Sequence, residues 1–440
     1  MSARNKELIG LVPVAGLLIA GFASVFIVRG DQLDNTSLIF GAYFFAICLA
    51  AHIFLRIRLP YADPYLFPLV ALLAAIGLVM LYRIDESFAR DQANWFVVGL
   101  LLFMATIVLL KDYFVLERYR YLIVTGGLIL LLLPRVPGIG AQVNGAYLGV
   151  DIGPLAFQPA EFGKLAVVIF LASYLRERRE VLVIGAKRFA GITFPPIKHL
   201  GPMLVVWGAA MFLLVFIRDL GSSLMFFGAF LALIYVATNR ISFVIIGLLM
   251  FFAGAWFFAN TVGHVGDRID VWLDPYADAS GDGYQVLQSM FAQADGGLFG
   301  RGIGESLLTA PGGKVPLIPE VQTDFIYALI VNELGLFGGC GVIAIYMLIA
   351  ARGFKIATIA QDGFSKLLAA GLTAVFALQA FVIIGGVIRV IPLTGVTLPF
   401  ISYGGSSVIA NMVLLALLLL VSDRARRPQR DPIVLAEENL

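Results

Sequence analysis

The chain has 440 residues, of which 60% are hydrophobic and only 14% are charged. A soluble domain has about 25% charged and about 45–50% apolar residues, so the composition excludes an ordinary soluble domain and indicates a polytopic membrane protein. The net charge of +2 gives no sign of a nucleic-acid partner. Cys48 and Cys340 lie in apolar runs and the three histidines are scattered, so neither a disulfide framework nor a histidine-ligated metal is predicted.

About twelve apolar segments approach the length of a membrane-spanning helix. They are residues 8–28, 37–55, 65–82, 93–110, 119–134, 160–175, 202–217, 221–238, 242–261, 324–351, 367–388 and 397–422. The first follows a short basic start, as in a signal peptide, but its length and the lack of a clear cleavage site favour a retained span. We therefore predict an all-α polytopic membrane protein with about twelve transmembrane helices.

The distribution of lysine and arginine predicts the orientation of these helices. With both termini in the cytoplasm, most basic residues fall on the inner side, including the cluster at 176–198 and the tail after residue 422. We therefore expect a multi-pass protein with both termini cytoplasmic.

Two segments on the predicted outer side are unusual. One comprises residues 135–159, and the other is the large extracytoplasmic loop 262–323, which is longer than a helix connection requires. Within that loop, apolar residues recur at helical spacing between Tyr284 and Phe291. The pattern predicts a short amphipathic helix that lies at the membrane interface or re-enters the membrane.

Ionisable side chains in or beside spans are informative, because a charge at the bilayer centre costs about 2.5–3.5 kcal/mol. Pro159 suits the first position of a helix, which puts Glu161 in the first turn and Lys164 on the same face. The pair could be a dipole-matched carboxylate with an ion-paired lysine, or part of a cavity in which Lys164 meets an anionic substrate. Asp219 lies in a tight turn, where it could equally cap the next helix.

Several cations fall on the predicted outer side. Each alone is a weak signal, because solvated loops carry such charges routinely. Together they could neutralise a phosphate or pyrophosphate. They are Lys164, Arg218, Arg268, Arg301 and Arg389.

Prolines and glycines interrupt the last spanning region within residues 392–412. Unpaired backbone at that depth is tolerated only where it is buried in protein or lines a wet cavity. Because the polar Ser402 and Tyr403 lie there among apolar neighbours, a cavity-lining broken helix is favoured over an ordinary loop with a helix start at Gly405 and Ser406.

Asp324 stands directly before an apolar run. Thr323 is a good N-cap residue, and an acid in the first helical turn complements the helix dipole. The other interpretation is a catalytic base on the outer face. The local pattern leaves these two interpretations balanced.

Several of these strings occur together in a fixed order between about residue 65 and residue 425. They read FQPAEFGKLA, RDLGSSL, LDP followed by GYQVLQS, GGLFGRGIG, IPEVQTDFIYALIVNELG and PLTGVTLPFISYGGSS. With them the chain resembles the SEDS family (shape, elongation, division and sporulation), the RodA/FtsW-type peptidoglycan polymerases. The resemblance implies two additional N-terminal helices at 1–60, a core of about ten helices at 61–425, and a short cytoplasmic tail at 426–440.

The resemblance also implies an activity. The family polymerises lipid II into β-1,4 glycan strands and releases polyprenyl pyrophosphate, with a divalent cation (Mg or Mn) and a class B penicillin-binding protein as the transpeptidase partner. The protein is then expected in the bacterial plasma membrane, and its short tail favours the elongation role. The alternatives are a division-type polymerase and a lipid II flippase. The clustering of the acidic residues and the long loop on the outer side argues against the flippase.

The resemblance assigns site residues position by position. Asp324 matches the essential outer-loop aspartate and is the expected catalytic base. The predicted substrate-binding residues are Gln158, Glu161, Lys164, Asp219, Arg268, Gln288, Arg301, Glu320, Thr323, Ser402 and Tyr403. The ligands of the expected divalent cation are left open.

Two positions depart from the family pattern. Tyr147 and Leu148 stand where a basic pair is common, so the role of that pair in holding pyrophosphate is either absent here or taken by Arg268 or Arg301. Gln322 stands where histidine is frequent, a change that is tolerable if the position only shapes the loop.

Overall fold

The computed structural model describes residues 2–29, 36–143, 146–152, 155–184, 187–189, 192–194, 197–216, 219–261, 263–306 and 317–427. Arg218 and most of the predicted tail lie outside these residues.

Each predicted apolar segment overlaps a helix. In chain order these helices are α1 (Ala3–Arg29), α2 (Thr36–Arg58), α3 (Leu66–Ile84), α4 (Glu86–Leu109), α6 (Arg120–Leu132), α7 (Pro159–Ile184), α8 (Ile197–Phe216), α9 (Leu220–Thr238), α10 (Ile241–Thr261), α13 (Ile326–Ile359), α14 (Gly363–Val387) and α15 (Gly405–Arg426). The short helices are α5 (Val115–Arg118), α11 (Gly263–Leu273), α12 (Tyr284–Gly296) and the 3₁₀ turn η1 (Leu133–Arg135). The amphipathic helix predicted in the long loop is α12, and α11 was not predicted.

Within the described residues, nine helices have the length, hydropathy and low charge of a membrane span. The other predicted spans correspond to α6, α7 and α8. α6 has 13 residues and is prolonged only by η1. Charges at both ends of α7 shorten its apolar stretch, and several α8 side chains lie outside the described part of the chain. The multi-pass helical architecture is confirmed.

The prediction of an all-α chain misses two small antiparallel sheets. β1 (Gly140–Val143), β2 (Ala146–Ile152) and β3 (Leu155–Phe157) pair in that order within the predicted outer segment 135–159. β4 (Lys187–Phe189) pairs with β5 (Ile192–Phe194) in the α7–α8 connection. These sheets lie between helices, where the chain leaves the apolar runs and pairs its backbone groups locally.

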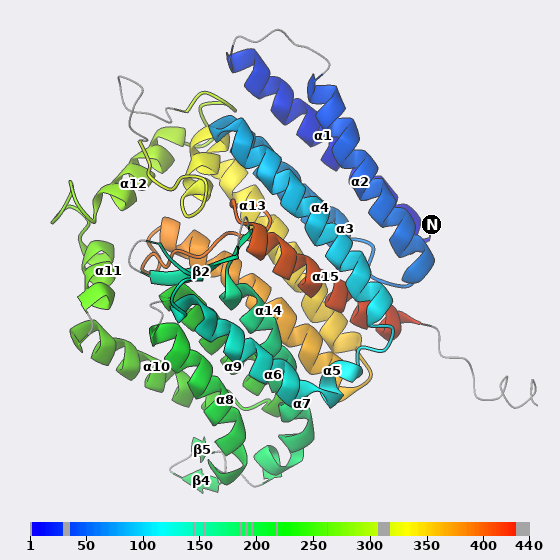
Figure 1. Cartoon of the computed structure of the whole chain (residues 1–440), viewed down its shortest axis with the longest axis vertical. Coiled ribbons are helices and arrows are strands. Elements are labelled where there is room, and N and C mark those ends of the chain that lie inside the picture. The colour runs from blue at the N-terminus through cyan, green and yellow to red at the C-terminus, as the bar shows by residue number, and fades with distance from the viewer. Residues whose placement is uncertain are drawn as a thin grey trace, which may run out of the picture.

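Figure 1 shows the long helices running diagonally through the molecule, with α11 and α12 at one side. α14 is the centre of the core: 83% of its spanning window is buried, and it packs against α7, α9 and α13. α10 is the opposite case, with 6% buried. A helix that is apolar all round is expected in a core, so α14 fits this rule and α10 leaves its apolar surface to the membrane.

Arginine side chains gather around buried acids at one end of the helix bundle. At this end, called the basic end, the buried Asp63 binds Arg352 and Arg426, and Asp423 accepts a hydrogen bond from the N–H of Tyr61 at 2.9 Å. α1 begins at this end of the bundle and α15 ends there, so both described termini of the chain lie at this end. The starts of α7, α9, α13 and α15, which carry most predicted site residues, lie at the other end (Figure 1).

Candidate active site

The site is built on a non-helical segment between α14 and α15, residues 388–404. The broken helix predicted here is wrong: the segment is an irregular loop, and α15 starts only at Gly405. Ser402 Oγ donates to the carbonyl of Thr323 at 2.6 Å and accepts from the N–H of Leu398 at 2.9 Å. The N–H of Tyr403 donates to the carbonyl of Gln322 at 2.9 Å. Residues 388–404 therefore hold the turn that precedes α13.

α4 supports this segment from the other side. The amide of Gln92 donates to the carbonyl of Ser402 at 3.0 Å and accepts from the N–H of Gly404 at 3.2 Å. The ring centroids of Phe88 and Tyr403 are 5.0 Å apart. Sequence reasoning missed Gln92, although a buried amide in an apolar helix signals a need for partners.

The predicted N-cap at Thr323 is wrong. α13 begins at Ile326, its N-cap Phe325 makes no side-chain cap bond, and Thr323 Oγ1 donates instead to the carbonyl of Glu320 at 3.2 Å. Glu320 has φ +54°, and its carbonyl also accepts the N–H groups of Thr323 and Asp324. This left-handed turn replaces the cap and carries Asp324 just outside the helix.

Asp324 is half-buried and its carboxylate accepts no hydrogen bond from any described residue. One carboxylate oxygen is 3.7 Å from the position that a Cβ on Gly395 would occupy. Burial, and after it the negative charge of Glu320, raise the pKa of Asp324 to about 7, and the positive charge of Arg268 opposes the shift. The carboxyl thus titrates near neutral pH, as a general base requires.

Backbone strain recurs in the turn before α13 and in residues 388–404. Among the described residues, the non-glycine residues with positive φ are Asn239, Glu320, Arg389 and Phe400. All but Asn239 belong to the turn before α13 or to residues 388–404. Each such conformation costs of order 1–3 kcal/mol and persists only where the surroundings enforce it, which is common at functional sites.

Arg268 and Asp219 flank the same loop. Arg268, on α11, donates to the carbonyl of Leu393 at 3.1 Å, and its charge acts on both Asp219 and Asp324. Asp219 caps α9 through the N–H of Ser222 at 2.9 Å, which confirms the predicted cap. Burial raises the pKa of Asp219, and its bonds to Ser222 oppose this.

Glu161 and Lys164 form the predicted ion pair at the start of α7, 2.5 Å apart. The Lys164 ammonium also donates to Gln379 at 2.6 Å and to Asn411 at 3.4 Å, and Gln379 returns a bond to Glu161 at 3.0 Å. Lys164 is 1% exposed. Because an ammonium has three donors, contact with a substrate phosphate would require one of these bonds to be exchanged.

This cluster, the Lys164 network, reaches the Asp324 segment. Gln379, on α14, donates to the carbonyl of Thr397 at 3.0 Å. The N–H of Gln158 donates to Ser406 Oγ at 2.9 Å, at the start of α15. The network joins α7, α14 and α15 beneath residues 388–404. Gln379 and Asn411 were missed, although amides inside apolar spans are an available signal.

Arg301 is not brought to Asp324. It pairs with Asp295 at 2.5 Å, and its N–H donates to the carbonyl of Asn332 at 3.0 Å. The surrounding GGLFGRGIG string packs against a kink of α13 at Gly335 (φ +71°), where an added Cβ would lie 2.4 Å from the N of Gly300. Its glycines therefore serve close backbone packing.

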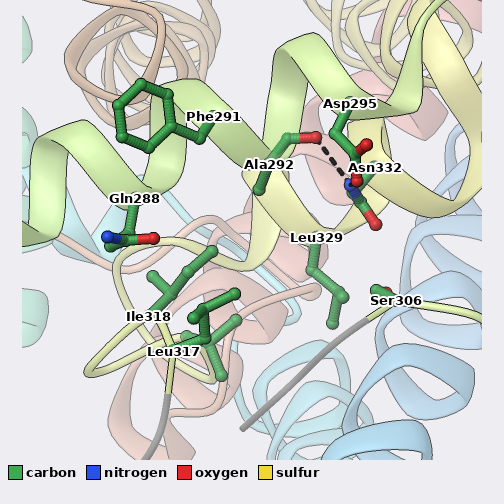
Figure 2. Close-up of a pocket in the computed structure, with 10 residues that line it drawn as sticks. Gln288, Phe291, Ala292, Asp295, Ser306, Leu317, Ile318, Leu329 and Asn332 are labelled. Atoms are coloured by element: carbon green, nitrogen blue, oxygen red, sulfur yellow. Dashed lines mark hydrogen bonds between the residues drawn. The ribbon is translucent and has the colours of Figure 1, made fainter. Parts of the chain in front are cut away.

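Gln288 lines a neighbouring pocket of about 280 Å³ between α12, α13 and residues 317–321. Figure 2 shows Asn332 in this pocket, donating to the carbonyl of Ala292 at 2.6 Å. Asn332 Oδ1 is buried without a partner among the described residues. The pocket is continuous with the segment that leads to Asp324, but Asp324 does not line it.

Arg135 lies beside Tyr147, one of the two positions where the basic pair common in the family is absent. The guanidinium of Arg135 lies 4.1 Å from the centre of the Tyr147 ring. The side chain of Leu148 lies outside the described residues. Arg135 was not among the predicted substitutes, Arg268 and Arg301.

No group of three metal-binding side chains occurs in the described part of the chain. The donor set still fits a hard cation of the Mg²⁺ type, which is often held by one or two carboxylates together with substrate phosphates. Asp324 and Glu320 supply two carboxylates close enough to interact electrostatically.

Comparison with known proteins identifies the family of this chain. The FtsW/RodA/SpoVE family, described as a cell cycle protein family, matches residues 64–427. Relatives include the peptidoglycan glycosyltransferase RodA of Mycobacterium tuberculosis (39% identity, covering 97% of this chain and 92% of the relative) and the stage V sporulation protein E of Bacillus subtilis (32%, 83% and 98%).

Solved structures agree. One, described as showing structural coordination of polymerization and crosslinking by a peptidoglycan synthase complex, superposes with a TM-score of 0.67 at 27% identity, covering 84% of this chain and 99% of that one. The crystal structure of the rod shape determining protein RodA of Thermus thermophilus gives 0.59 at 26%, covering 84% and 98%. The chain belongs to the FtsW/RodA/SpoVE family.

Proposed function

We propose that this protein is an inverting peptidoglycan glycosyltransferase that polymerises lipid II into β-1,4 glycan strands for cell-wall elongation. The observation that carries the proposal is the half-buried Asp324, whose pKa is raised to about 7 within a strained loop. Family membership and the relatives named peptidoglycan glycosyltransferase support the reaction class.

The reaction forms one bond and breaks one. The 4-hydroxyl oxygen of one sugar attacks the anomeric carbon of a lipid-linked sugar, the bond from that carbon to the pyrophosphate oxygen breaks, and the hydroxyl proton passes to Asp324. Because pyrophosphate is a good leaving group, no carboxylic acid has to protonate it, unlike in glycosidases. The charge on the leaving group needs cations.

Arg268 is the proposed cation from the protein, because it lies close enough to act on Asp324 and is anchored on Leu393. A divalent cation, Mg²⁺ or Mn²⁺, would be held by Glu320 and the substrate phosphates, which leaves Asp324 free as the base, and would neutralise charge on the pyrophosphate. The Lys164 network positions residues 388–404 beneath the reacting groups.

Membrane placement follows the same reasoning. The basic end is proposed to face the cytoplasm, by the positive-inside rule, so both termini are cytoplasmic and Asp324 is on the outer face of a bacterial plasma membrane. A class B penicillin-binding protein is the proposed transpeptidase partner, which the likeness to a peptidoglycan synthase complex supports.

Polymerisation by purified protein in detergent tests this proposal against a flippase. Polymerisation requires no compartments, whereas flipping does. We expect wild-type protein, with Mg²⁺ or Mn²⁺ and a class B penicillin-binding protein present, to convert lipid II into glycan strands in detergent. Transport of lipid II in vesicles without any polymer in either setting would favour the flippase.

A further inference from the structure

A second pocket lies at the basic end, where α2, α4 and α15 end. Its volume is about 550 Å³, and it is lined by four cationic side chains, one carboxylate and an apolar wall. The lining residues used below are Arg58, Lys111, Arg424, Arg427, Asp423, Leu59, Ile107 and Leu420. We call it the basic pocket. α15 separates it from Asp324, since 22 residues span about 33 Å at 1.5 Å per residue.

The basic pocket carries a surplus of positive charge. Asp423 is already bound to Arg427 at 2.8 Å. Arg424 lies over the Phe114 ring at 4.4 Å and meets Asp112 only at a distance of 3.8 Å. The remaining cations have no ion pair among the described residues; they are Arg58 and Lys111. A ligand that matches this charge is an anion.

The surroundings of the basic pocket match an amphiphile. Leu59, Ile107 and Leu420 add apolar side chains to its lining. Beside them, Ile57 and Leu109 are 73% and 80% exposed at the ends of the spanning helices α2 and α4. Exposed aliphatic side chains at this level face hydrocarbon, while lysine and arginine extend their charged groups toward the polar layer. A free phosphate ion would leave these apolar side chains unused.

We propose that the basic pocket binds the headgroup phosphate of an anionic membrane phospholipid, with its acyl chains along the exposed Ile57 and Leu109. Basic pockets between helices at a cytoplasmic surface are suited to such headgroups. Arg58 and Leu59 come from the end of α2 and the residue after it, whereas Lys111 and Arg424 come from the family-matched region. A bound lipid therefore fastens the N-terminal helix pair to the rest of the protein.

The test uses full-length protein purified in detergent. Native mass spectrometry and thermal melting are measured with phosphatidylglycerol and with phosphatidylcholine. We expect phosphatidylglycerol to be retained preferentially and to raise the melting temperature. Because each basic residue near a membrane surface contributes about 1 kcal/mol, Lys111→Gln should weaken retention roughly fivefold, and Lys111→Gln with Arg424→Gln roughly 25-fold.

Lys355→Gln is the matched control, because Lys355 is exposed at the same end but does not line the basic pocket. It should leave retention unchanged. Lys111 is exposed, so its single variant tests the proposal even if the double variant fails to fold.

Three results would overturn the proposal. The first is equal retention of both lipids, or retention of phosphatidylglycerol that Lys111→Gln does not change. The second is displacement of phosphatidylglycerol by inorganic phosphate alone, which would indicate a soluble anion. The third is retention seen only after residues 428–440 are removed, which would make the C-terminal segment the occupant.

Discussion

The Asp324 turn and the Lys164 network both contain acids that the sequence predicts as site residues, but the two regions differ in burial and in hydrogen bonding. Lys164 is 1% exposed and donates to Glu161, Gln379 and Asn411. Asp324 is half-buried, accepts no hydrogen bond within the described residues, and follows a residue with strained backbone, Glu320. A satisfied network stabilises the fold, whereas an unsatisfied acid lowers stability in exchange for reactivity. On this comparison we propose a structural role for Lys164 and a chemical role for Asp324.

The strongest way to test this comparison is to remove the charge of Asp324. Since a general base contributes about 10²–10⁴-fold, Asp324→Asn should lower polymerisation of lipid II at least about 100-fold. Asp219→Asn is the matched control, because asparagine is an equally good N-cap and Asp219 is not the proposed base. Equal losses in both variants would remove the distinction.

The same variant has a stability readout with a defined sign. The folded pKa of Asp324, about 7, lies above the ordinary aspartate value of about 3.9. The folded state is therefore penalised as the pH rises from about 4 to about 7, and the penalty is constant above that. Asp324→Asn should raise the melting temperature more at pH 8 than at pH 5. If Asp324 were a structural acid, the same substitution would lower the melting temperature at both pH values.

Lys164→Met tests the structural role proposed for Lys164. Removing one partner of a buried ion pair costs about 3–5 kcal/mol, because Glu161 is left buried and unpaired. We expect a lower melting temperature and less folded protein. Glu161→Gln combined with Lys164→Met should recover part of the stability, and melting curves of both variants measure this. A Lys164→Met protein as stable as wild type would rule out the structural role.

Gly395→Ala sharpens the comparison at the loop itself. Gly395 has φ +72° and lies against the carboxylate of Asp324. An alanine there costs about 1–2 kcal/mol and displaces the loop, so we expect roughly tenfold lower activity with a modest fall in melting temperature. Gly254→Ala, in α10 with open space around it, is the control and should be silent.

Gln322→His should have the smallest effect. The carbonyl of Gln322 binds Tyr403, and its side chain makes a 3.2 Å bond to Glu320. Histidine keeps the backbone bond, so activity should stay within about twofold of wild type. A larger change in the polymerisation assay would give the side chain a role beyond shaping the turn.

The contrast between the regions also explains what the sequence could predict. Long apolar runs predict the helices because burial and bilayer length constrain them directly. Glu161 and Lys164 were paired because their spacing is local, but Gln379 and Asn411 join them from α14 and α15 through tertiary packing. The cap at Thr323 failed because Glu320 adopts a left-handed turn that local propensity does not encode, and β1–β3 form in a segment without strand-length apolar alternation.

The pH dependence of kcat/KM for polymerisation tests the central claim most directly. A base must be unprotonated, so the rate of wild-type protein should rise with pH to a midpoint of about 7 and then level off, and Asp324→Asn should lose this limb. A wild-type profile with its midpoint at the ordinary aspartate pKa of about 4, or a limb near 7 that survives in Asp324→Asn, would contradict the account.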